Sequence, residues 1–282
     1  MMADARNAEQ VEFWNGPTGR RWVERQEQQD ALLSPITAAL LTHAAARPGE
    51  HVIDIGCGCG ETTIALGRRV LPGGGVVGID ISAPMLTHAA TRVQPGLPIE
   101  LVEADATTHP FAAGAFDLLV SRFGVMFFAE PERAFANLRR ALRSGGRLVF
   151  VCFRAPRDNP WIMLPLNAAY EHVPPLPKTG PEDPGPFAYA SDERVRRILA
   201  GAGFSSIALE ALDVKLDLAG GRGLDAAVDA ALLMGPASRA IEGQPPAVRD
   251  AVQASMRRLL ASHQQGETVP LAAAFWLVSA SG

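Results

Sequence analysis

Apolar residues in the first half of the chain gather in short runs that are separated by longer amphipathic stretches. Five runs read as strands, at residues 51–55, 76–79, 99–103, 116–121 and 147–153. The stretches 61–70, 82–93 and 131–142 carry apolar residues at helical spacing. Continuous apolar runs are typical of strands that are buried on both faces. Their alternation with helices predicts a parallel sheet covered by helices on both sides.

The chain on either side of this region has a different pattern. Residues 1–50 predict helices with a break at 15–19, and Ser34-Pro35 predicts the start of an apolar helix that continues to Ala46. Residues 154–190 hold many prolines and scattered aromatic residues, which indicates a long functional insertion. Further on, 191–200, 224–234 and 247–262 predict helices, and 207–218 and 272–279 predict strands.

These elements divide the chain into four expected parts. They are a helical lid at 1–50, a ligand-binding core at 51–153, a substrate cap at 154–190, and a C-terminal part at 191–282 that completes the sheet and adds helices.

The stretch after the first predicted strand carries three glycines at alternate positions, Gly56, Gly58 and Gly60. Their missing side chains let the backbone approach a ligand closely. The helix that follows would point its free N–H groups at the same ligand. Strand, glycine loop and helix N-terminus together predict a site of the nucleotide-binding type.

An aspartate stands at the end of each of the first three predicted strands. Asp54, Asp80 and Asp105 should therefore line one crevice, because ligands of open parallel sheets bind at the carboxyl ends of the strands. Asp80 follows the glycine loop at a distance where a carboxylate can accept hydrogen bonds from both hydroxyls of a ribose.

The composition of the chain excludes several kinds of partner and site. The chain has 282 residues, 48% of them hydrophobic, and a formal net charge of -4 without a basic cluster. Nucleic acid and anionic membranes are therefore not expected partners. The first residues lack the layout of a targeting signal and no apolar run reaches the roughly 18 residues of a membrane helix, so we expect a cytoplasmic protein. Cys57, Cys59 and Cys152 are expected to be free thiols, and no metal site is expected.

Five motifs in order resemble those of class I S-adenosylmethionine-dependent methyltransferases, and most of all the small-molecule branch that includes ubiquinone and menaquinone methyltransferases. They are VIDIGCGCG at 52–60, GIDIS at 78–82, EADA at 103–106, FDLLVS at 116–121 and LRSGGRLVF at 142–150. The resemblance covers residues 45–153 well and the remainder loosely. It implies a doubly wound, mostly parallel, seven-stranded Rossmann-like methyltransferase fold with N-terminal helices and an inserted cap. The implied cofactor is S-adenosylmethionine, with S-adenosylhomocysteine as product.

The resemblance also implies roles for single residues. Asp54 and the loop residues Gly56, Cys57, Gly58 and Gly60 would hold the methionine portion of the cofactor. Asp80 would bind the ribose, Ile81 and Met85 would flank the adenine, and Asp105 with Ala106 would read its edge. Ser121 and Arg122 would lie where cofactor and acceptor meet. Trp22, an aromatic residue in a polar region, would close over the ligand, although docking of a terminal helix explains it equally well.

Two other classes of function are weighed against this one. A dinucleotide-dependent oxidoreductase would place a third glycine where Glu61 stands, and an acid there would repel a pyrophosphate. A non-catalytic module that binds S-adenosylmethionine would show cofactor binding without turnover.

The region 161–189 predicts the kind of acceptor. Apolar and aromatic residues among stiff prolines indicate a cap over a small, partly apolar molecule. The sequence leaves open which atom receives the methyl group and what the oligomeric state is. Positioning of the acceptor should matter more than acid–base chemistry. If a general base is used, the candidates are His172, Tyr170 and Glu171 in the cap and His109 near the adenine side, and His172 beside an apolar helix turn is the preferred one.

Overall fold

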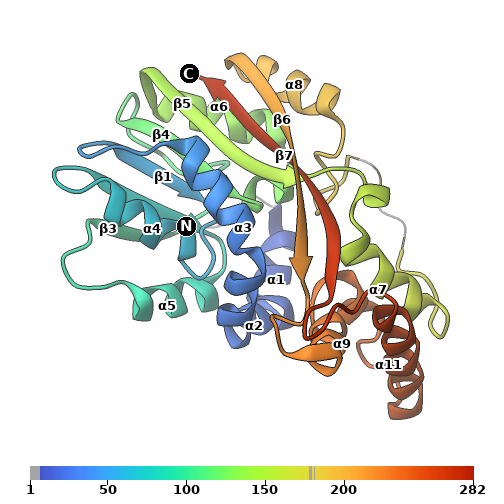
Figure 1. Cartoon of the computed structure of the whole chain (residues 1–282). Coiled ribbons are helices and arrows are strands. Elements are labelled where there is room, and N and C mark those ends of the chain that lie inside the picture. The colour runs from blue at the N-terminus through green and yellow to red at the C-terminus, as the bar shows by residue number, and fades with distance from the viewer. Residues whose placement is uncertain (1–6, 178–179, 181) are drawn as a thin grey trace.

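The computed structural model describes residues 7–177, 180 and 182–282, and it contains a seven-stranded sheet in the order β3-β2-β1-β4-β5-β7-β6 (Figure 1). Residues 1–6 of the predicted lid and 178–179 and 181 of the predicted cap lie outside the described residues. The strands are β1 His51–Ile55, β2 Gly75–Asp80, β3 Ile99–Glu103, β4 Phe116–Arg122, β5 Leu142–Phe153, β6 Ser205–Asp217 and β7 Pro270–Ser281. All seven predicted strands are confirmed.

Strands β1 to β5 pair in parallel, while β7 runs antiparallel between β5 and β6. The carboxyl ends of β1, β2, β3, β4 and β5 consequently meet at one edge of the sheet. This edge collects the acids that follow the strands, as the sequence predicted.

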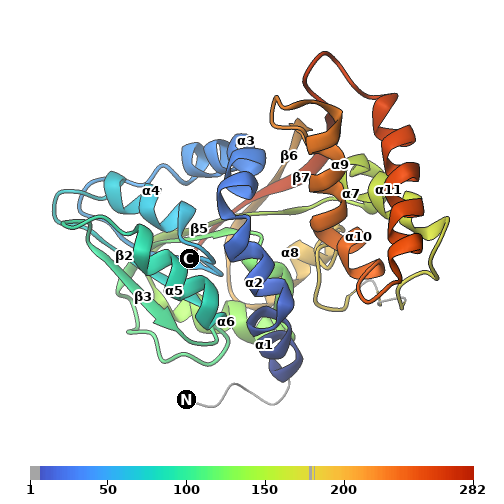
Figure 2. The same ribbon diagram turned by 90° about the horizontal axis from the view of Figure 1, so that it is seen from below.

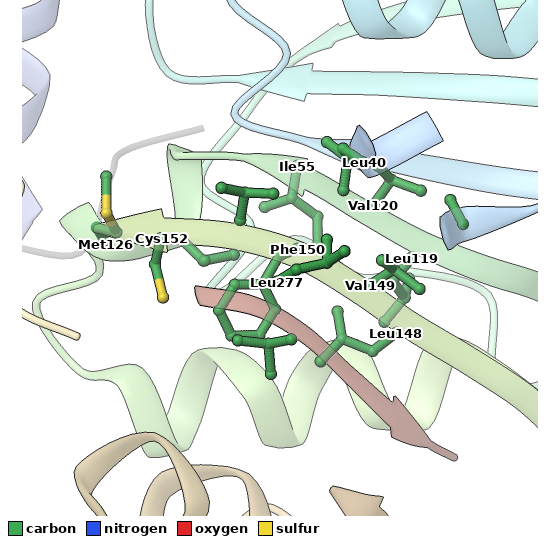
Figure 3. Packing of buried hydrophobic residues seen from close by; sticks show 14 of the residues in the cluster. Leu40, Ile55, Leu119, Val120, Met126, Leu148, Val149, Phe150, Cys152 and Leu277 are labelled. Carbon is green, nitrogen blue, oxygen red and sulfur yellow. The ribbon is translucent and has the colours of Figure 1, made fainter. Parts of the chain in front are cut away.

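Helices cover the two faces of the sheet. They include α3 Gln26–Ala44, α4 Glu61–Arg69, α5 Ala83–Arg92, α6 Pro131–Ala141 and α8 Asp192–Gly201. In Figure 1, α3 lies in front of the sheet and α6 and α8 lie behind it. Figure 3 shows how Ile55, Val120 and Leu40 of α3 pack on one another, and all three are at most 1% exposed. Because β1, β4 and β5 are apolar on both faces, this core fixes the strand ends that carry the polar residues.

The N-terminal region forms α1 Ala8–Asn15, α2 Pro17–Glu24 and the long α3. The predicted helix start at Ser34-Pro35 is wrong, because α3 continues through Pro35. A proline inside a helix leaves the carbonyl four residues earlier without its N–H donor. Here the hydroxyl of Ser34 donates to that carbonyl, Ala31 O, at 2.8 Å, and so reduces the cost of the interruption.

A second apolar core lies beside the sheet, in a unit that we call the helical unit. Its helices are α7 Pro160–Tyr170, α9 Gly223–Leu233, α10 Gly235–Ala240 and α11 Pro246–Ala261. They pack through buried residues such as Leu166, Val228 and Met256. Figure 2 shows α7, α9, α10 and α11 together on one side, and α1, α2 and α3 between them and α5. The predicted cap therefore contains a helix that shares its core with helices inserted between β6 and β7. Within the described ranges, no helix is long and apolar enough to cross a membrane.

Candidate cofactor site

The glycine loop follows β1 and brings its backbone against the chain that leaves β4. Gly56, Gly58 and Gly60 have φ values of 65°, 53° and 85°, which only glycine adopts readily. A Cβ atom at Gly56 would lie 2.6 Å from the Cα of Gly124. The loop is therefore held by a backbone-to-backbone contact that has no room for a side chain, and α4 begins directly after it.

Asp54 is fully buried under this loop. Its Oδ2 accepts hydrogen bonds from the hydroxyls of Thr62 (2.5 Å) and Thr63 (2.6 Å), whereas its Oδ1 has no partner among the described residues. Burial raises the pKa of this carboxyl, and the two hydroxyl donors and the charge of Arg122 oppose the rise. A buried acceptor without a donor is costly, so it favours a cationic or N–H ligand group.

Asp80 closes the opposite side of the loop at the end of β2. It is 8% exposed and accepts hydrogen bonds from Gly58 N at 2.8 Å and Ser82 N at 2.9 Å. Burial raises the pKa of Asp80 to about 6, against these backbone donors. Met85 packs beside the loop, with its Sδ 3.7 Å from the position of a Cβ on Gly58. The residue predicted for the ribose and one predicted for the adenine thus lie together.

Asp105 follows β3, and its carboxylate has two donors. Thr107 N donates to Oδ1 at 2.8 Å, and the side-chain amide of Asn7 donates to Oδ2 at 3.0 Å. Asn137 Nδ2 donates to Ala106 O at 2.8 Å and orders the chain after the strand. Sequence reasoning missed Asn7, because a polar residue just before a short helix gives no signal of a distant partner.

The N-terminal helices are fastened to the residues after β2. Asn15 Nδ2 donates to Ile81 O at 2.8 Å, and Asn15 Oδ1 accepts from Ala83 N at 3.0 Å. The Ser82 hydroxyl donates to Trp14 O at 2.8 Å. Trp14 also packs edge-on against Trp22, with ring centroids 6.5 Å apart. The segment that was expected to close over a ligand is therefore bonded to the side of the site where Asp80 and Ile81 lie.

Two predicted site residues have structural contacts of their own. The Ser121 hydroxyl donates to Ile55 O at 2.7 Å and accepts from Val125 N, and thereby ties β4 to β1 beneath the loop. Burial raises the pKa of the Cys57 thiol well above its ordinary value, so Cys57 is a small neutral group within the loop. Among the residues that the structure describes, no cluster of His, Cys, Asp and Glu is arranged to hold a metal ion.

His172 lies apart from this constellation, just after α7 in the helical unit. Its Nε2 contacts the Ser255 hydroxyl of α11 at 2.7 Å, and Glu171 Oε2 is 3.9 Å away. In Figure 2, α7 and α11 lie on the far side of α1 and α2 from α5. The contact with Ser255 connects the end of α7 to α11. A role for His172 as general base stays a prediction.

The glycine loop and the acids at the carboxyl ends of three parallel strands define a Rossmann-like protein that binds a nucleoside-bearing cofactor. Residues 53–150 match a family model described as a methyltransferase domain. A demethylmenaquinone methyltransferase of Thermus thermophilus is 33% identical over 174 residues, which are 57% of this chain and 77% of the relative. The nocamycin O-methyltransferase of Saccharothrix syringae is 36% identical over 40% of this chain and 41% of its own length.

Among solved structures, the YcgJ protein of Bacillus subtilis shares the fold, with a TM-score of 0.57 at 16% identity over 87% of this chain and 97% of its own. The chain belongs to the class I S-adenosylmethionine-dependent methyltransferases. Its cofactor is S-adenosylmethionine, and membership of this family excludes the dinucleotide-dependent oxidoreductase considered from the sequence. The unpartnered Oδ1 of Asp54 and the acids around the loop fit this cofactor, which is cationic at sulfur and nitrogen.

Proposed function

We propose that the enzyme methylates a small, partly apolar acceptor held at the carboxyl ends of β4 and β5. The supporting observation is a group of aromatic rings at this position. Phe153 lies 4.9 Å from Phe123, 6.0 Å from Trp161 and 5.7 Å from Phe187, measured between ring centroids. Phe123, Trp161 and Phe187 are partly exposed, so their rings can contact a ligand. Few polar groups would be needed to orient an apolar molecule here.

The same site supports the assignment of cofactor contacts made from the sequence. We propose that Asp54 and the loop at Gly56, Cys57, Gly58 and Gly60 hold the methionine portion, and that Asp80 accepts from the ribose. Ile81 and Met85 would flank the adenine, and Asp105 with Ala106 would contact its edge. Trp22 would close over the bound ligand, and Ser121 would lie where cofactor and acceptor meet. The bound cofactor supplies a methyl group on a sulfonium, so the protein has chiefly to align the acceptor with it.

The four-part division of the chain is kept as part of the proposal, with one addition. The cap over the acceptor would consist of the predicted 154–190 segment together with α9, α10 and α11, because α7 shares its core with them. We further propose that the protein works in the cytoplasm, where its three buried free cysteines would stay reduced. Because the protein has a formal net charge of -4, we do not expect a nucleic acid as acceptor.

A screen with cofactor carrying a labelled methyl group tests the acceptor class. Phenols, carboxylic acids, amines, thiols and quinone precursors are offered separately, since the relatives' names include both a demethylmenaquinone enzyme and an O-methyltransferase. We expect label in an apolar, ring-bearing compound and none in bulk protein or nucleic acid. Transfer only to a macromolecule would contradict the proposal.

The role of His172 is tested by His172→Ala with a saturating acceptor. Because its ring contacts Ser255 in the helical unit, we expect kcat to fall by less than about tenfold, with an unchanged pH profile. Stability should fall by about 1 kcal/mol through the lost hydrogen bond. A larger loss of kcat together with a displaced acid limb of the profile would instead identify His172 as the base.

A further inference from the structure

Arg122 is the last residue of β4, and its side chain is held beside the glycine loop by α3. Its side chain is 12% exposed. Nη1 donates to the Thr37 hydroxyl at 2.7 Å, and Nη2 donates to Asp30 Oδ1 at 3.1 Å. In the described part of the chain these contacts use two of the five N–H groups of an arginine. The planar head is thus fixed in place while donors remain for a further group.

A second arginine nearby has more acceptors around it. Arg92 of α5 lies 3.1 Å from Asp30 Oδ2 and 2.7 Å from Glu61 Oε2, and it donates to Cys59 O at 2.5 Å. Among the residues that the structure describes, the direct partners of Arg122 are the shared carboxylate of Asp30 and the neutral hydroxyl of Thr37. Of the two cations, Arg122 is therefore the one whose charge is less neutralised.

The surroundings of the loop are rich in acids. Asp54 and Asp80 flank the loop, while Asp30 and Glu61 belong to the network around the two arginines. Burial raises the pKa of Asp54 and of Cys59, and the charge of Arg122 opposes both rises, so the guanidinium lies within electrostatic reach of both ends of the loop. The cofactor ends in an amino acid that carries a carboxylate as well as an ammonium. An anion is repelled among these acids unless a cation receives it.

We propose that Arg122 pairs with the carboxylate of the cofactor's amino-acid group, and that Asp30 and Thr37 position the guanidinium for this contact. The assignment rests on the cofactor site proposed above, in which Asp54 faces the ammonium of the same group. Arginine suits the task because its fork matches the two oxygens of a carboxylate.

Calorimetric titration with two ligands separates this role from a structural one. S-adenosylhomocysteine carries the amino-acid group, and 5′-methylthioadenosine lacks it. In Arg122→Met we expect the Kd for S-adenosylhomocysteine to rise by about 10- to 100-fold, as for a lost charge-assisted hydrogen bond, while the Kd for 5′-methylthioadenosine stays within about twofold. Arg122→Lys, which keeps the charge but not the fork, should be intermediate.

Arg69→Met is the matched control, since Arg69 donates to Leu41 O and should leave both affinities unchanged. Equal losses for both ligands in Arg122→Met would overturn the proposal and make Arg122 only a brace between β4 and α3. Unchanged binding of both would overturn it as well. Failure of wild-type protein to bind S-adenosylhomocysteine would be a distinct result, because it would remove the cofactor site itself.

Discussion

Replacing Gly56 with alanine is expected to abolish measurable binding of S-adenosylhomocysteine. The added Cβ would stand 2.6 Å from the Cα of Gly124, a backbone atom that cannot rotate away. The residue also needs a φ of 65°, which costs an alanine about 1–2 kcal/mol. With overpacking of about 1–3 kcal/mol added, stability should fall by about 2–5 kcal/mol. The glycine loop would have to move away from the chain that follows β4, and its contacts with the cofactor would be lost. Calorimetry and thermal unfolding measure the two effects.

Gly49→Ala is the matched control for the conformational cost. Gly49 has a φ of 85°, and nothing lies within 4 Å of the place that a Cβ would take, so alanine there brings strain without a clash. We expect a small loss of stability and normal binding. Gly124→Ala approaches the same contact from the segment that follows β4, with its Cβ 2.6 Å from Ile55 O and 2.7 Å from Gly56 Cα, and should resemble Gly56→Ala. Normal binding in both clashing variants would show that the loop is not the cofactor site.

Asp80→Ala is expected to weaken S-adenosylhomocysteine binding by at least about tenfold. A carboxylate that accepts from two hydroxyls contributes about 1–3 kcal/mol relative to its absence. The variant also leaves Gly58 N and Ser82 N without their acceptor, which loosens the loop. Isothermal titration at neutral pH measures the change. Equal Kd values for the wild type and Asp80→Ala would remove Asp80 from the site.

The pH dependence of binding follows from the raised pKa of Asp80, which is about 6 in the free protein. Only the ionised carboxylate can accept from both hydroxyls, so affinity should fall about tenfold per unit as the pH drops below 6. For the free protein the sign is opposite. Because the folded pKa exceeds the unfolded one, protonation of Asp80 stabilises the fold as the pH falls from 7 toward 4. In Asp80→Asn, binding affinity and stability should both depend less on pH. The dependence that remains would be due to Asp54, whose pKa is also raised.

The strands and the glycine loop of residues 51–153 could be predicted because the sequence features that indicate them are local. An apolar run, a turn that only glycine permits and an acid at the strand end are all contiguous in sequence, and parallel pairing then brings Asp54, Asp80 and Asp105 to one edge. The alternation of strands and helices and the family motifs predicted a mostly parallel, seven-stranded sheet, whereas the order of its strands is seen only in the structure.

The contacts of the N-terminal helices and of the helical unit were not predictable in the same way. Asn7 and Asn15 lie in a polar stretch, and their partners Asp105 and Ile81 are distant in the chain, so composition gives no sign of these contacts. Pro35 misled the helix assignment because the Ser34 hydroxyl satisfies Ala31 O, which no spacing rule anticipates. The core shared by α7 and α11 likewise joins segments on opposite sides of β6 in the sequence.

The helical unit is built from two insertions in the chain, one after β5 and one after β6. Both insertions leave and rejoin the sheet without interrupting the strands that carry Asp54, Asp80 and Asp105. Changes in α7, α9, α10 or α11 can therefore accumulate without altering the residues beneath the cofactor. Under the proposed function, the strand ends would serve what is common to the reaction and the helical unit what is particular to the acceptor, so that new acceptor preferences would arise in the helical unit while the cofactor residues stay constant.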